Sequence, residues 1–128
     1  MPVITNIEDL RVLAEKRVPR MFYDYADSGS WTEGTYRANE NDFHAIQLRQ
    51  RVAVNMENRS TATTMVGVPS HMPVSIAPVG LTGMQHADGE IHAAQAAKKF
   101  GIPFTLSTMS ICSIEDIAQH TQAPFWFQ

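Results

Sequence analysis

The 128-residue sequence has little cysteine: Cys112 is its single thiol, so no disulfide can form within the chain. This scarcity fits a reducing compartment. The sequence also lacks any run approaching the roughly 20 apolar residues that a membrane-spanning helix needs. Its first eight residues lack the basic segment followed by an apolar run that marks a secretory signal. We therefore expect a cytoplasmic protein, and attachment to a membrane surface stays open as the alternative.

A concentration of positive charge is absent as well. The formal net charge is −3 and the pI is about 5.9. The densest basic group, formed by Lys16, Arg17 and Arg20, is short. Nucleic acids bind surfaces on which basic residues cluster. We therefore expect no nucleic-acid partner and interpret the basic group as a solvated helix face.

Several motifs that would identify a cofactor or a metal are missing. The chain contains neither the G-x-G-x-x-G pattern of dinucleotide-binding proteins nor a Walker loop. Cys112 has no strongly activating neighbour and is interpreted as a buried, inert thiol. The histidines lack the helical spacing of a metal-binding pair, so no metal site is predicted. They are His44, His71, His86, His92 and His120.

Helical signals dominate residues 1–47. Asn6 is suited to cap a first helix, and Pro19 to occupy the first position of a second helix, where a missing N–H costs nothing. Gly29 is suited to end that second helix in a left-handed conformation. Residues 30–33 have the Ser-x-x-Glu spacing of a capping box, which predicts a third helix. The buried stripe of that third helix is predicted to consist of Tyr36, Phe43 and Ile46.

The periodicity changes in residues 48–71, where a small β-hairpin is predicted. Val52 and Val54 alternate with their neighbours in a short extended run, and residues 61–66 are rich in β-branched side chains. Residues 67–70 read Gly-Val-Pro-Ser, a combination typical of a turn.

Residues 72–128 alternate between strand and helix signals. Buried strands are predicted at 72–78, 102–107 and 124–128. An alanine-rich helix at 87–100, stopped by Gly101, and a second helix opened by Ser113 lie between them. Parallel strands joined by crossover helices form an α/β sheet. An open doubly wound sheet and a closed (β/α)₈ barrel both begin in this way, so both stay open on these signals.

Candidate binding residues lie at strand ends, because parallel α/β folds bind ligands beyond the carboxyl ends of their strands. Pro78, Val79 and Gly80 follow the first strand, and Pro78 and Gly80 would let the backbone approach a flat ring. Ser107 and Gln128 end the second and third strands and can hydrogen-bond carbonyl oxygens or ring nitrogens. This chemistry suits a planar cofactor with apolar faces, such as a flavin. Ordinary loop residues remain the alternative.

Two tyrosines share the second predicted helix. Tyr23 and Tyr25 are two residues apart, so their side chains point in different directions. At most one of them packs in a core, and the other can face a pocket. A phenol in such a pocket can hydrogen-bond a substrate carboxylate.

Several stretches, in their order along the chain, match one known family. They are 22–25 with 28–29, 48–51, 60–64, 72–80, 88–90, 101–108 and 126–128. Through these stretches the chain resembles the flavin-dependent L-2-hydroxy acid oxidases and dehydrogenases. Residues 78–80 and 104–110 most resemble the bacterial L-lactate dehydrogenase branch of that family.

The resemblance implies that the chain forms the N-terminal portion of a (β/α)₈ TIM barrel, an α/β fold, within a single FMN hydroxy acid dehydrogenase domain. It implies a helical lead-in at 1–47, a hairpin at 48–71 and the first three barrel strands within 72–128. An apolar strand at the chain terminus would leave an exposed sheet edge, which we interpret as a sign of truncation.

The resemblance also implies a site at the carboxyl-terminal mouth of the barrel, where FMN would be the cofactor. Tyr25 would hold the substrate carboxylate. The remaining implied contacts are to FMN: Pro78, Val79 and Gly80 along the isoalloxazine, and Ser107 and Gln128 at its polar edge.

The implied activity is the FMN-dependent oxidation of an L-2-hydroxy acid, expected to be L-lactate, to the 2-oxo acid by hydride transfer to flavin N5. In such enzymes a histidine base, an arginine and a lysine act from later strands, so no catalytic residue is expected among these 128, which should be inactive alone. A quinone, a cytochrome or oxygen would accept the electrons. A homo-oligomer, cytoplasmic or peripheral on the inner membrane, is expected.

Two departures leave the substrate open. Ala26 stands where many relatives carry an aromatic residue, and Val79-Gly80 replaces the threonine-alanine of the glycolate oxidase type. The alternatives are an FMN barrel enzyme with another substrate, or a short non-catalytic protein that binds flavin or complements a barrel. Because three barrel strands leave sheet edges unpaired, the isolated chain is expected to be unstable or self-associating.

Overall fold

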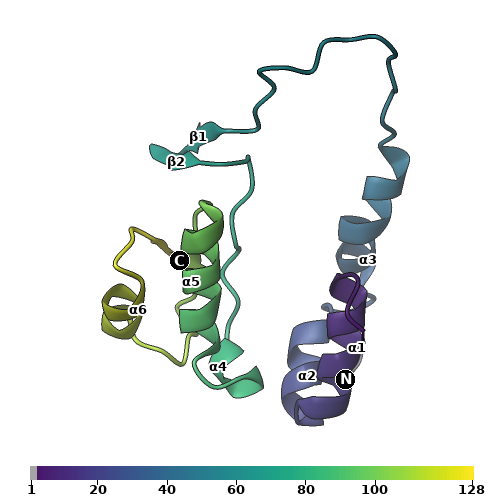
Figure 1. Cartoon of the computed structure of the whole chain (residues 1–128). Helices are drawn as coiled ribbons and strands as arrows, with labels where there is room; N and C mark the ends of the chain where they lie inside the picture. The colour runs from purple at the N-terminus through teal and green to yellow at the C-terminus, as the bar shows by residue number, and fades with distance from the viewer. Residues whose placement is uncertain (1–2) are drawn as a thin grey trace. The chain divides into compact units, whose positions relative to one another are not determined.

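The computed structural model describes residues 3–128, which form two compact units, Met1–Arg59 and Ser60–Gln128 (Figure 1). The first unit is helical. It contains α1 (Ile7–Arg17), α2 (Arg20–Asp27) and α3 (Gly34–Asn41), followed by the 3₁₀ helix η1 (Asp42–Ala45). The three predicted helices are therefore confirmed. Among the described residues of this unit none is fully buried, so the unit has no closed core of its own.

The first helix begins at a reciprocal cap. The Asn6 side-chain oxygen accepts the N–H of Asp9 at 3.0 Å, and the Asp9 carboxylate accepts the N–H of Asn6 at 3.2 Å. These bonds satisfy donors that the first turn of a helix leaves without partners. The predicted role of Asn6 is confirmed.

A polar network joins α1 to α2. The Arg11 guanidinium donates to the Tyr23 hydroxyl at 2.7 Å and to the Asp27 carboxylate at 3.1 Å. The Tyr23 hydroxyl donates to the same carboxylate oxygen at 2.7 Å. This hydrogen bond to Asp27 raises the pKa of Tyr23 above its usual value of 10.0, because it stabilises the protonated phenol. The network pairs two helices that are too short to be stable alone.

The helix boundaries differ from two predictions. Pro19 caps α2 instead of occupying its first position, since its ψ of 133° is extended. Gly29 does not adopt the predicted left-handed conformation: Ser28 ends α2 in an extended conformation. Gly29 meets a different need, because a Cβ there would come within 2.7 Å of the Tyr36 Cβ. Its missing side chain permits a close contact between the chain after α2 and α3.

The predicted capping box at residues 30–33 is wrong. Glu33 precedes α3 in a left-handed conformation, with φ of 59°, and no side chain caps this helix. The Glu33 carboxylate instead accepts the N–H of Gly29 at 3.2 Å, and its own N–H donates to the Ser30 carbonyl at 2.9 Å. The Ser-x-x-Glu spacing therefore closes a turn and does not cap the helix.

The predicted buried stripe is also wrong, because its residues are exposed. Tyr36 is 41% exposed, Phe43 73% and Ile46 71%. Only Tyr36 lies in α3, whereas Phe43 lies in η1 and Ile46 follows it. A 3₁₀ turn has three residues per turn, so the helical spacing that would align these side chains is lost.

The hairpin in the second unit is shorter than predicted. β1 (Thr63–Met65) pairs antiparallel with β2 (Val68–Ser70). The turn consists of Val66 and Gly67, both with positive φ, as a type I′ hairpin turn requires. Residues 68–70, predicted as turn, therefore form the second strand. Val52 and Val54 lie in irregular chain in the first unit, outside any strand.

Three extended segments run parallel in the second unit, in the predicted order. Ile76 forms a single parallel bridge with Phe104, and β3 (Thr105–Leu106) pairs with β4 (Trp126–Phe127). The strand predicted at 72–78 is reduced to that bridge, because prolines on both sides of Ile76 lack the N–H that a ladder needs. The predicted parallel topology is confirmed, and three such segments do not form a closed barrel.

Three helices belong to this unit. α5 (Gly89–Phe100) and α6 (Ile114–Thr121) pack on these segments through a shared core, and the short helix α4 (Thr82–Gln85), which was not predicted, contacts α5. Gly101 ends α5 with φ of 76°, and Ser113 caps α6 in a reciprocal box with Asp116, both as predicted. The core between β3 and these helices consists of Ile91, Ala94, Ala97, Phe104, Leu106 and Ile117.

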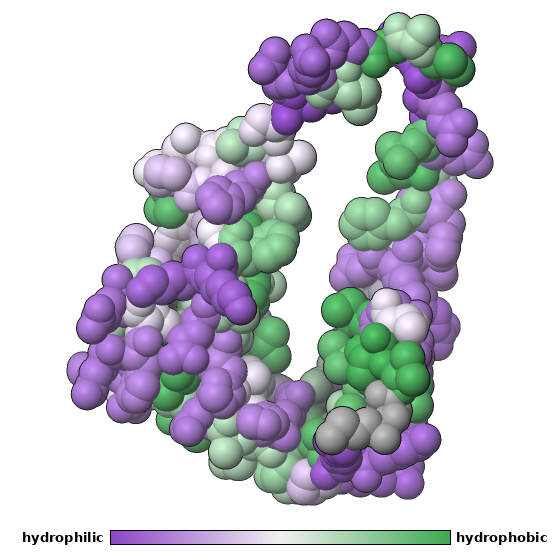
Figure 2. Space-filling model, viewed as in Figure 1, coloured by the Kyte–Doolittle hydropathy of each residue, from purple (hydrophilic) through white to green (hydrophobic). Residues whose placement is uncertain are grey.

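The surfaces of the two units differ in polarity. Hydrophilic residues cover the outer side of α6, whereas apolar residues lie exposed on the helical unit (Figure 2). Ile7, Met21 and Trp31 are among these exposed apolar residues. The second unit thus buries a core of its own, and the first unit leaves much of its apolar surface in solvent.

Candidate functional site

Two predicted site residues meet at the carboxyl ends of β3 and β4. The parallel register places Ser107 beside Gln128, whose N–H donates to the Leu106 carbonyl at 3.0 Å. The Ser107 hydroxyl donates to the side-chain oxygen of Gln128 at 3.3 Å and accepts the N–H of Met109 at 3.0 Å. Ser107 is buried and Gln128 is exposed. The pair therefore offers hydrogen-bonding groups at an edge open to solvent.

The other predicted stretch, Pro78–Val79–Gly80, follows the bridge at Ile76. Its loop is tied to the loop after β3, because the N–H of Leu81 donates to the Met109 carbonyl at 2.9 Å. Within the loop, the Thr82 hydroxyl donates to the Val79 carbonyl at 3.1 Å. The structure thus joins the two loops that carry the predicted residues of this unit.

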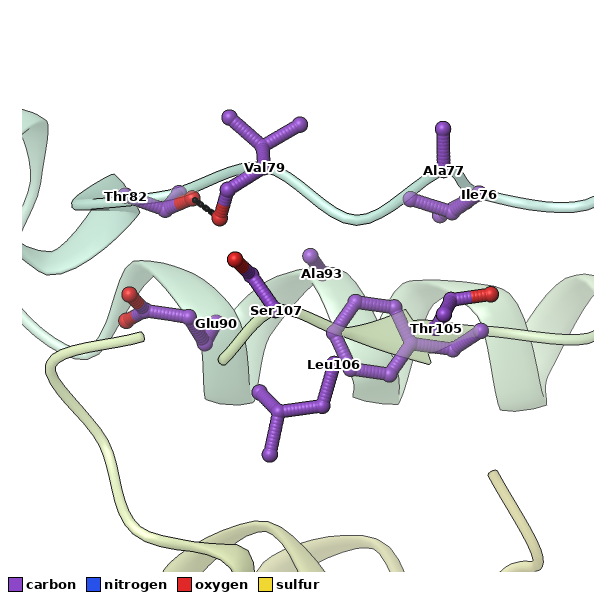
Figure 3. Close-up of a pocket in the computed structure, with 10 residues that line it drawn as sticks. Ile76, Ala77, Val79, Thr82, Glu90, Ala93, Thr105, Leu106 and Ser107 are labelled. Carbon is purple, nitrogen blue, oxygen red and sulfur yellow. Dashed lines mark hydrogen bonds between the residues drawn. The ribbon is translucent and has the colours of Figure 1, made fainter. Parts of the chain in front are cut away.

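A small cavity lies between these loops, with Val79 on one side and Ser107 on the other (Figure 3). Its volume is about 100 Å³ and its wall is mostly apolar. Pro78, Gly80 and Gln128 are not part of the wall. The lining residues are Ile76, Ala77, Val79, Thr82, Glu90, Ala93, Phe104, Thr105, Leu106 and Ser107.

Glu90 is a buried charge beside this cavity that the sequence reasoning missed. It lies in the first turn of α5 and is only 2% exposed. One carboxylate oxygen, Oε1, accepts the N–H of Gly83 and the N–H of Ile111, each at 3.0 Å. Burial by itself raises the pKa of Glu90, but these backbone donors outweigh it and the pKa is lower than usual. Glu90 is therefore ionised at neutral pH.

The available sequence signal for Glu90 was its place directly after Gly89, at the start of a predicted helix. A Cβ on Gly89 would come within 2.8 Å of the Thr82 carbonyl oxygen, and one on Gly83 within 2.8 Å of the Ile111 Cβ. Both glycines are needed for the close approach of chain around the carboxylate. That approach depends on the folded loops, so spacing along the chain could not identify it.

Cys112 lies beside the Glu90 carboxylate. Burial raises the pKa of the thiol, and the neighbouring carboxylate raises it further, to about 11. The thiolate is the reactive form, so the predicted inert character of Cys112 agrees with its surroundings. Its side chain is half-buried instead of fully buried.

Tyr25 belongs to α2 in the helical unit and is 51% exposed. Its neighbour Tyr23 is half-buried and bonded to Asp27. The two phenols therefore differ in burial and in hydrogen bonding. Tyr25 is the one left free of the α1–α2 network.

Neither metal ligands nor membrane spans are found in the described part of the chain. Among residues 3–128 no three histidine, cysteine or acidic side chains gather in a way that could hold a metal ion. The His86 and His92 rings contact each other edge to face, with centroids 5.5 Å apart. No helix formed by these residues is both long and apolar enough to cross a membrane.

Parallel strands and crossover helices define an α/β protein, and proteins of this class bind ligands at the carboxyl ends of their strands, where the polar groups described above lie. The chain belongs to the FMN-dependent dehydrogenase family, whose model matches residues 14–128. FMN is the cofactor of this family.

Known relatives are hydroxy acid oxidoreductases. An L-lactate dehydrogenase from Stenotrophomonas maltophilia is 47% identical over 126 residues, which cover 98% of this chain and 33% of the relative. The membrane-associated (S)-mandelate dehydrogenase from Pseudomonas putida, solved as a soluble mutant, is 39% identical with a TM-score of 0.88, covering 98% of this chain and 36% of the other. A lactate oxidase from Pediococcus acidilactici is 31% identical with a TM-score of 0.88, covering 99% and 36%.

The chain spans about a third of the length of the curated relatives it matches. The similar solved structures are those of (S)-mandelate dehydrogenase, mandelate oxidase and lactate oxidase, and the chain likewise covers about a third of each. The described elements are thus those of an α/β protein similar to one part of such enzymes.

Proposed function

We propose that the protein containing this chain oxidises an L-2-hydroxy acid, L-lactate foremost, to the corresponding 2-oxo acid with FMN as cofactor. The observation that carries the proposal is the 47% identity to an L-lactate dehydrogenase along 98% of the chain. FMN, when bound, supplies a two-electron acceptor for the hydride of the substrate Cα.

The residues at the strand ends fit one edge of a flavin. The isoalloxazine has apolar faces and a polar edge, and the cavity wall is mostly apolar while Ser107 and Gln128 present polar groups beside it. At about 100 Å³ the cavity is too small to enclose three fused rings. The ring would therefore lie over the cavity mouth, against the loop that holds Val79.

Each predicted contact has a role in this proposal. Pro78, Val79 and Gly80 would pack along the ring, and the Ser107–Gln128 pair would hydrogen-bond its polar edge. The exposed phenol of Tyr25 would donate to the substrate carboxylate. Its exposure and its freedom from the Arg11 network support that role.

The proton that leaves the substrate hydroxyl needs a base, and the one ionisable side chain in the cavity wall, Glu90, already accepts two backbone N–H groups. None of the residues that line the cavity is a histidine. His86 and His120 each direct a ring nitrogen to a nearby backbone carbonyl, at 2.7 and 2.8 Å. We therefore assign no catalytic base among the described residues, and the histidine, arginine and lysine of the reaction would lie outside the 128.

The wider arrangement follows the same proposal. Residues 1–47 would form a helical lead-in, 48–71 a segment ending in the hairpin, and 72–128 the first three strands of a (β/α)₈ barrel.

A quinone, a cytochrome or oxygen would take the electrons, and the enzyme would be a homo-oligomer. Similarity to a membrane-associated mandelate dehydrogenase supports peripheral attachment to the inner membrane as the second candidate to a free cytoplasmic location.

A second candidate substrate is (S)-mandelate. The 39% identity to (S)-mandelate dehydrogenase, with a TM-score of 0.88, favours it over other hydroxy acids. Initial rates with L-lactate, (S)-mandelate and D-lactate and an artificial electron acceptor separate the two candidates. We expect L-lactate to give the highest kcat/KM and D-lactate to give none.

Substitution at the strand ends tests the proposed flavin contacts. In the natural protein, Ser107→Ala and Gln128→Leu are expected to weaken FMN binding about 10-fold each, because each removes a hydrogen bond to the ring edge (about 1.4 kcal/mol per tenfold). Fluorescence titration of the protein stripped of flavin measures this. Gln119→Leu, on the exposed side of α6, is the matched control. FMN affinity unchanged in both strand-end variants would refute the contacts.

A further inference from the structure

Two hydrogen-bonded connections hold together the two loops that carry the proposed flavin contacts. One direct backbone bond connects them, from the Leu81 N–H to the Met109 carbonyl at 2.9 Å. The second connection is the Glu90 carboxylate, which accepts the N–H of Gly83 in α4, directly after the first loop, and the N–H of Ile111 in the second loop, each at 3.0 Å. Both connections lie within a few residues of Val79 and Ser107.

The Glu90 carboxylate is costly to bury, so its position needs a reason. It is 2% exposed, and its second oxygen, Oε2, has no hydrogen-bond partner. A buried charge without full pairing destabilises a fold. Part of this cost is offset by the charge-assisted bonds to two amides and by the positive end of the 12-residue helix α5.

Gly83 shows how closely the chain packs around the Glu90 carboxylate. A Cβ on Gly83 would come within 2.8 Å of Ile111 and 3.1 Å of the Glu90 Oε2. A side chain at Gly83 would therefore push the two loops apart. The two loops therefore pack closely against Gly83 and the Glu90 carboxylate.

We infer that Glu90 is a positioning residue of the flavin site: its buried carboxylate sets the spacing between the loop at 78–81, through the start of α4 that follows it, and the loop at 107–111. This inference rests on the proposed function, since it assigns those loops to FMN. In this inference Glu90 is not itself assigned a contact with cofactor or substrate. It acts through the backbone that carries Pro78–Gly80 and through the loop that follows Ser107.

Two variants separate charge from length. Glu90→Gln keeps the shape and loses the charge, whereas Glu90→Asp keeps the charge and cannot reach both amides. The matched control is Glu115→Gln, which removes a carboxylate from the first turn of α6, where the side chain is exposed. All are made in the natural protein at its natural length, prepared with and without FMN.

Hydrogen exchange and flavin binding are the first two measurements. We expect the Gly83 and Ile111 amides to exchange at least 10-fold faster in Glu90→Asp, with a smaller increase in Glu90→Gln and none in Glu115→Gln. We expect the Kd for FMN to rise about 10-fold in Glu90→Asp. Unchanged exchange at both amides, or an unchanged Kd despite faster exchange, would overturn the inference.

The single thiol supplies a readout that a purely structural role would not move. Because Glu90 stabilises the protonated thiol, Glu90→Gln should shift the pH midpoint of Cys112 alkylation to lower pH, whereas Glu115→Gln leaves it in place. An unmoved midpoint in Glu90→Gln would show that the carboxylate does not face the chain at Ile111 and Cys112, and it would overturn the inference even if that variant is less stable.

Failure of this inference can be told from failure of the proposed function. If the natural protein binds no FMN in any form, the proposed function fails, and with it the assignment of Glu90 to a flavin site. If FMN binds tightly and equally to the natural protein and both Glu90 variants, the proposed function stands and the role of Glu90 is overturned.

Discussion

At the scale of single residues, two glycines occupy positions that a side chain would disturb, either through the backbone conformation or through a steric clash. Gly67 and Gly101 both have positive φ, at 80° and 76°. Nothing lies within 4 Å of a Cβ built on Gly67, whereas one on Gly101 would collide with the His71 ring. The two sites therefore separate the conformational cost of a side chain from its steric cost.

Alanine at these two glycines should destabilise the protein to different extents. Gly67→Ala is expected to cost about 1 kcal/mol, the penalty for a left-handed alanine. Gly101→Ala adds a clash with His71 and should cost more. Urea unfolding of the natural protein and both variants measures the difference. Equal losses of unfolding free energy would contradict the reading of the Gly101 contact.

The Tyr23 phenol should ionise at unusually high pH. Its hydrogen bond to Asp27 raises its pKa, so it contributes stability that is present below pH 10 and is lost as the pH rises through the folded-state pKa. Asp27→Asn should bring the pKa of Tyr23 back toward 10. The difference in tyrosinate absorbance between the natural protein and Tyr23→Phe follows this one phenol. An ionisation midpoint of Tyr23 that Asp27→Asn leaves unchanged would contradict the hydrogen bond between Tyr23 and Asp27.

Predictions for single residues succeeded where a polar residue stands at the end of a strand and the strand register brings it to a partner. The sequence predicts Ser107 and Gln128 as polar residues at strand ends, and the parallel pairing of β3 with β4 brings them into contact. Their binding of flavin remains a prediction. Glu90 was missed because its partners, Gly83 and Ile111, are brought to it by loops whose path the sequence does not encode locally.

At the scale of elements, the helix ends with complete capping boxes were the most predictable features. Ser113 and Asp116 exchange hydrogen bonds at 3.0 Å, from each backbone N–H to the other's side chain. Such signals work over three residues and need no tertiary partner. The false box at residues 30–33 shows the limit, because Glu33 bonds to Gly29 across a turn.

The α6 cap makes stability dependent on acid pH. Hydrogen bonds from the Ser113 hydroxyl and N–H lower the pKa of Asp116 below its usual 3.8. Its contribution is therefore present above pH 3.8 and is lost as the pH falls through the lowered folded-state pKa. Asp116→Asn should flatten the stability profile between pH 2 and 4, measured by circular dichroism during urea unfolding. The same slope in the natural protein and the variant would count against the cap.

The Ser113 side of the same cap can be tested at neutral pH. Ser113→Ala should lower the free energy of unfolding by about 1 kcal/mol, since it removes the acceptor for the Asp116 N–H. Ser30→Ala is the matched control, because Ser30 belongs to the false box and no side chain caps α3. A loss as large in Ser30→Ala would show that the α6 box has no special role.

Strand lengths were less predictable than helix ends. The strand expected at 72–78 contributes a single bridge residue, Ile76, whose N–H donates to Pro103 at 2.9 Å and whose carbonyl accepts from Thr105 at 3.1 Å. Apolar patterning marks a segment as buried. Apolar patterning does not predict the length of the paired strand, because that length also depends on the backbone hydrogen bonds that prolines remove.

At the scale of the whole molecule, the two units differ in how much apolar surface they bury. The second has a core around Leu106 and Ile117, both fully buried, whereas the first has no fully buried residue among those described. In the described chain the outer edges of β4 and of the segment at Ile76 have no partner strand. Open edges and exposed apolar side chains favour association.

The 128-residue polypeptide prepared alone should therefore self-associate and hold FMN poorly. Analytical ultracentrifugation across a range of concentrations measures the first property, and flavin absorbance after gel filtration the second. A monomer with a sharp cooperative melt and bound flavin would contradict this prediction.

The most direct test of the central claim is the flavin absorbance of the protein isolated from its natural source, recorded before and after anaerobic addition of L-lactate. The proposed function predicts an FMN band that bleaches with L-lactate, is unaffected by D-lactate, and is accompanied by one equivalent of 2-oxo acid per flavin. A protein without FMN, or an FMN band that no L-2-hydroxy acid bleaches, would contradict it.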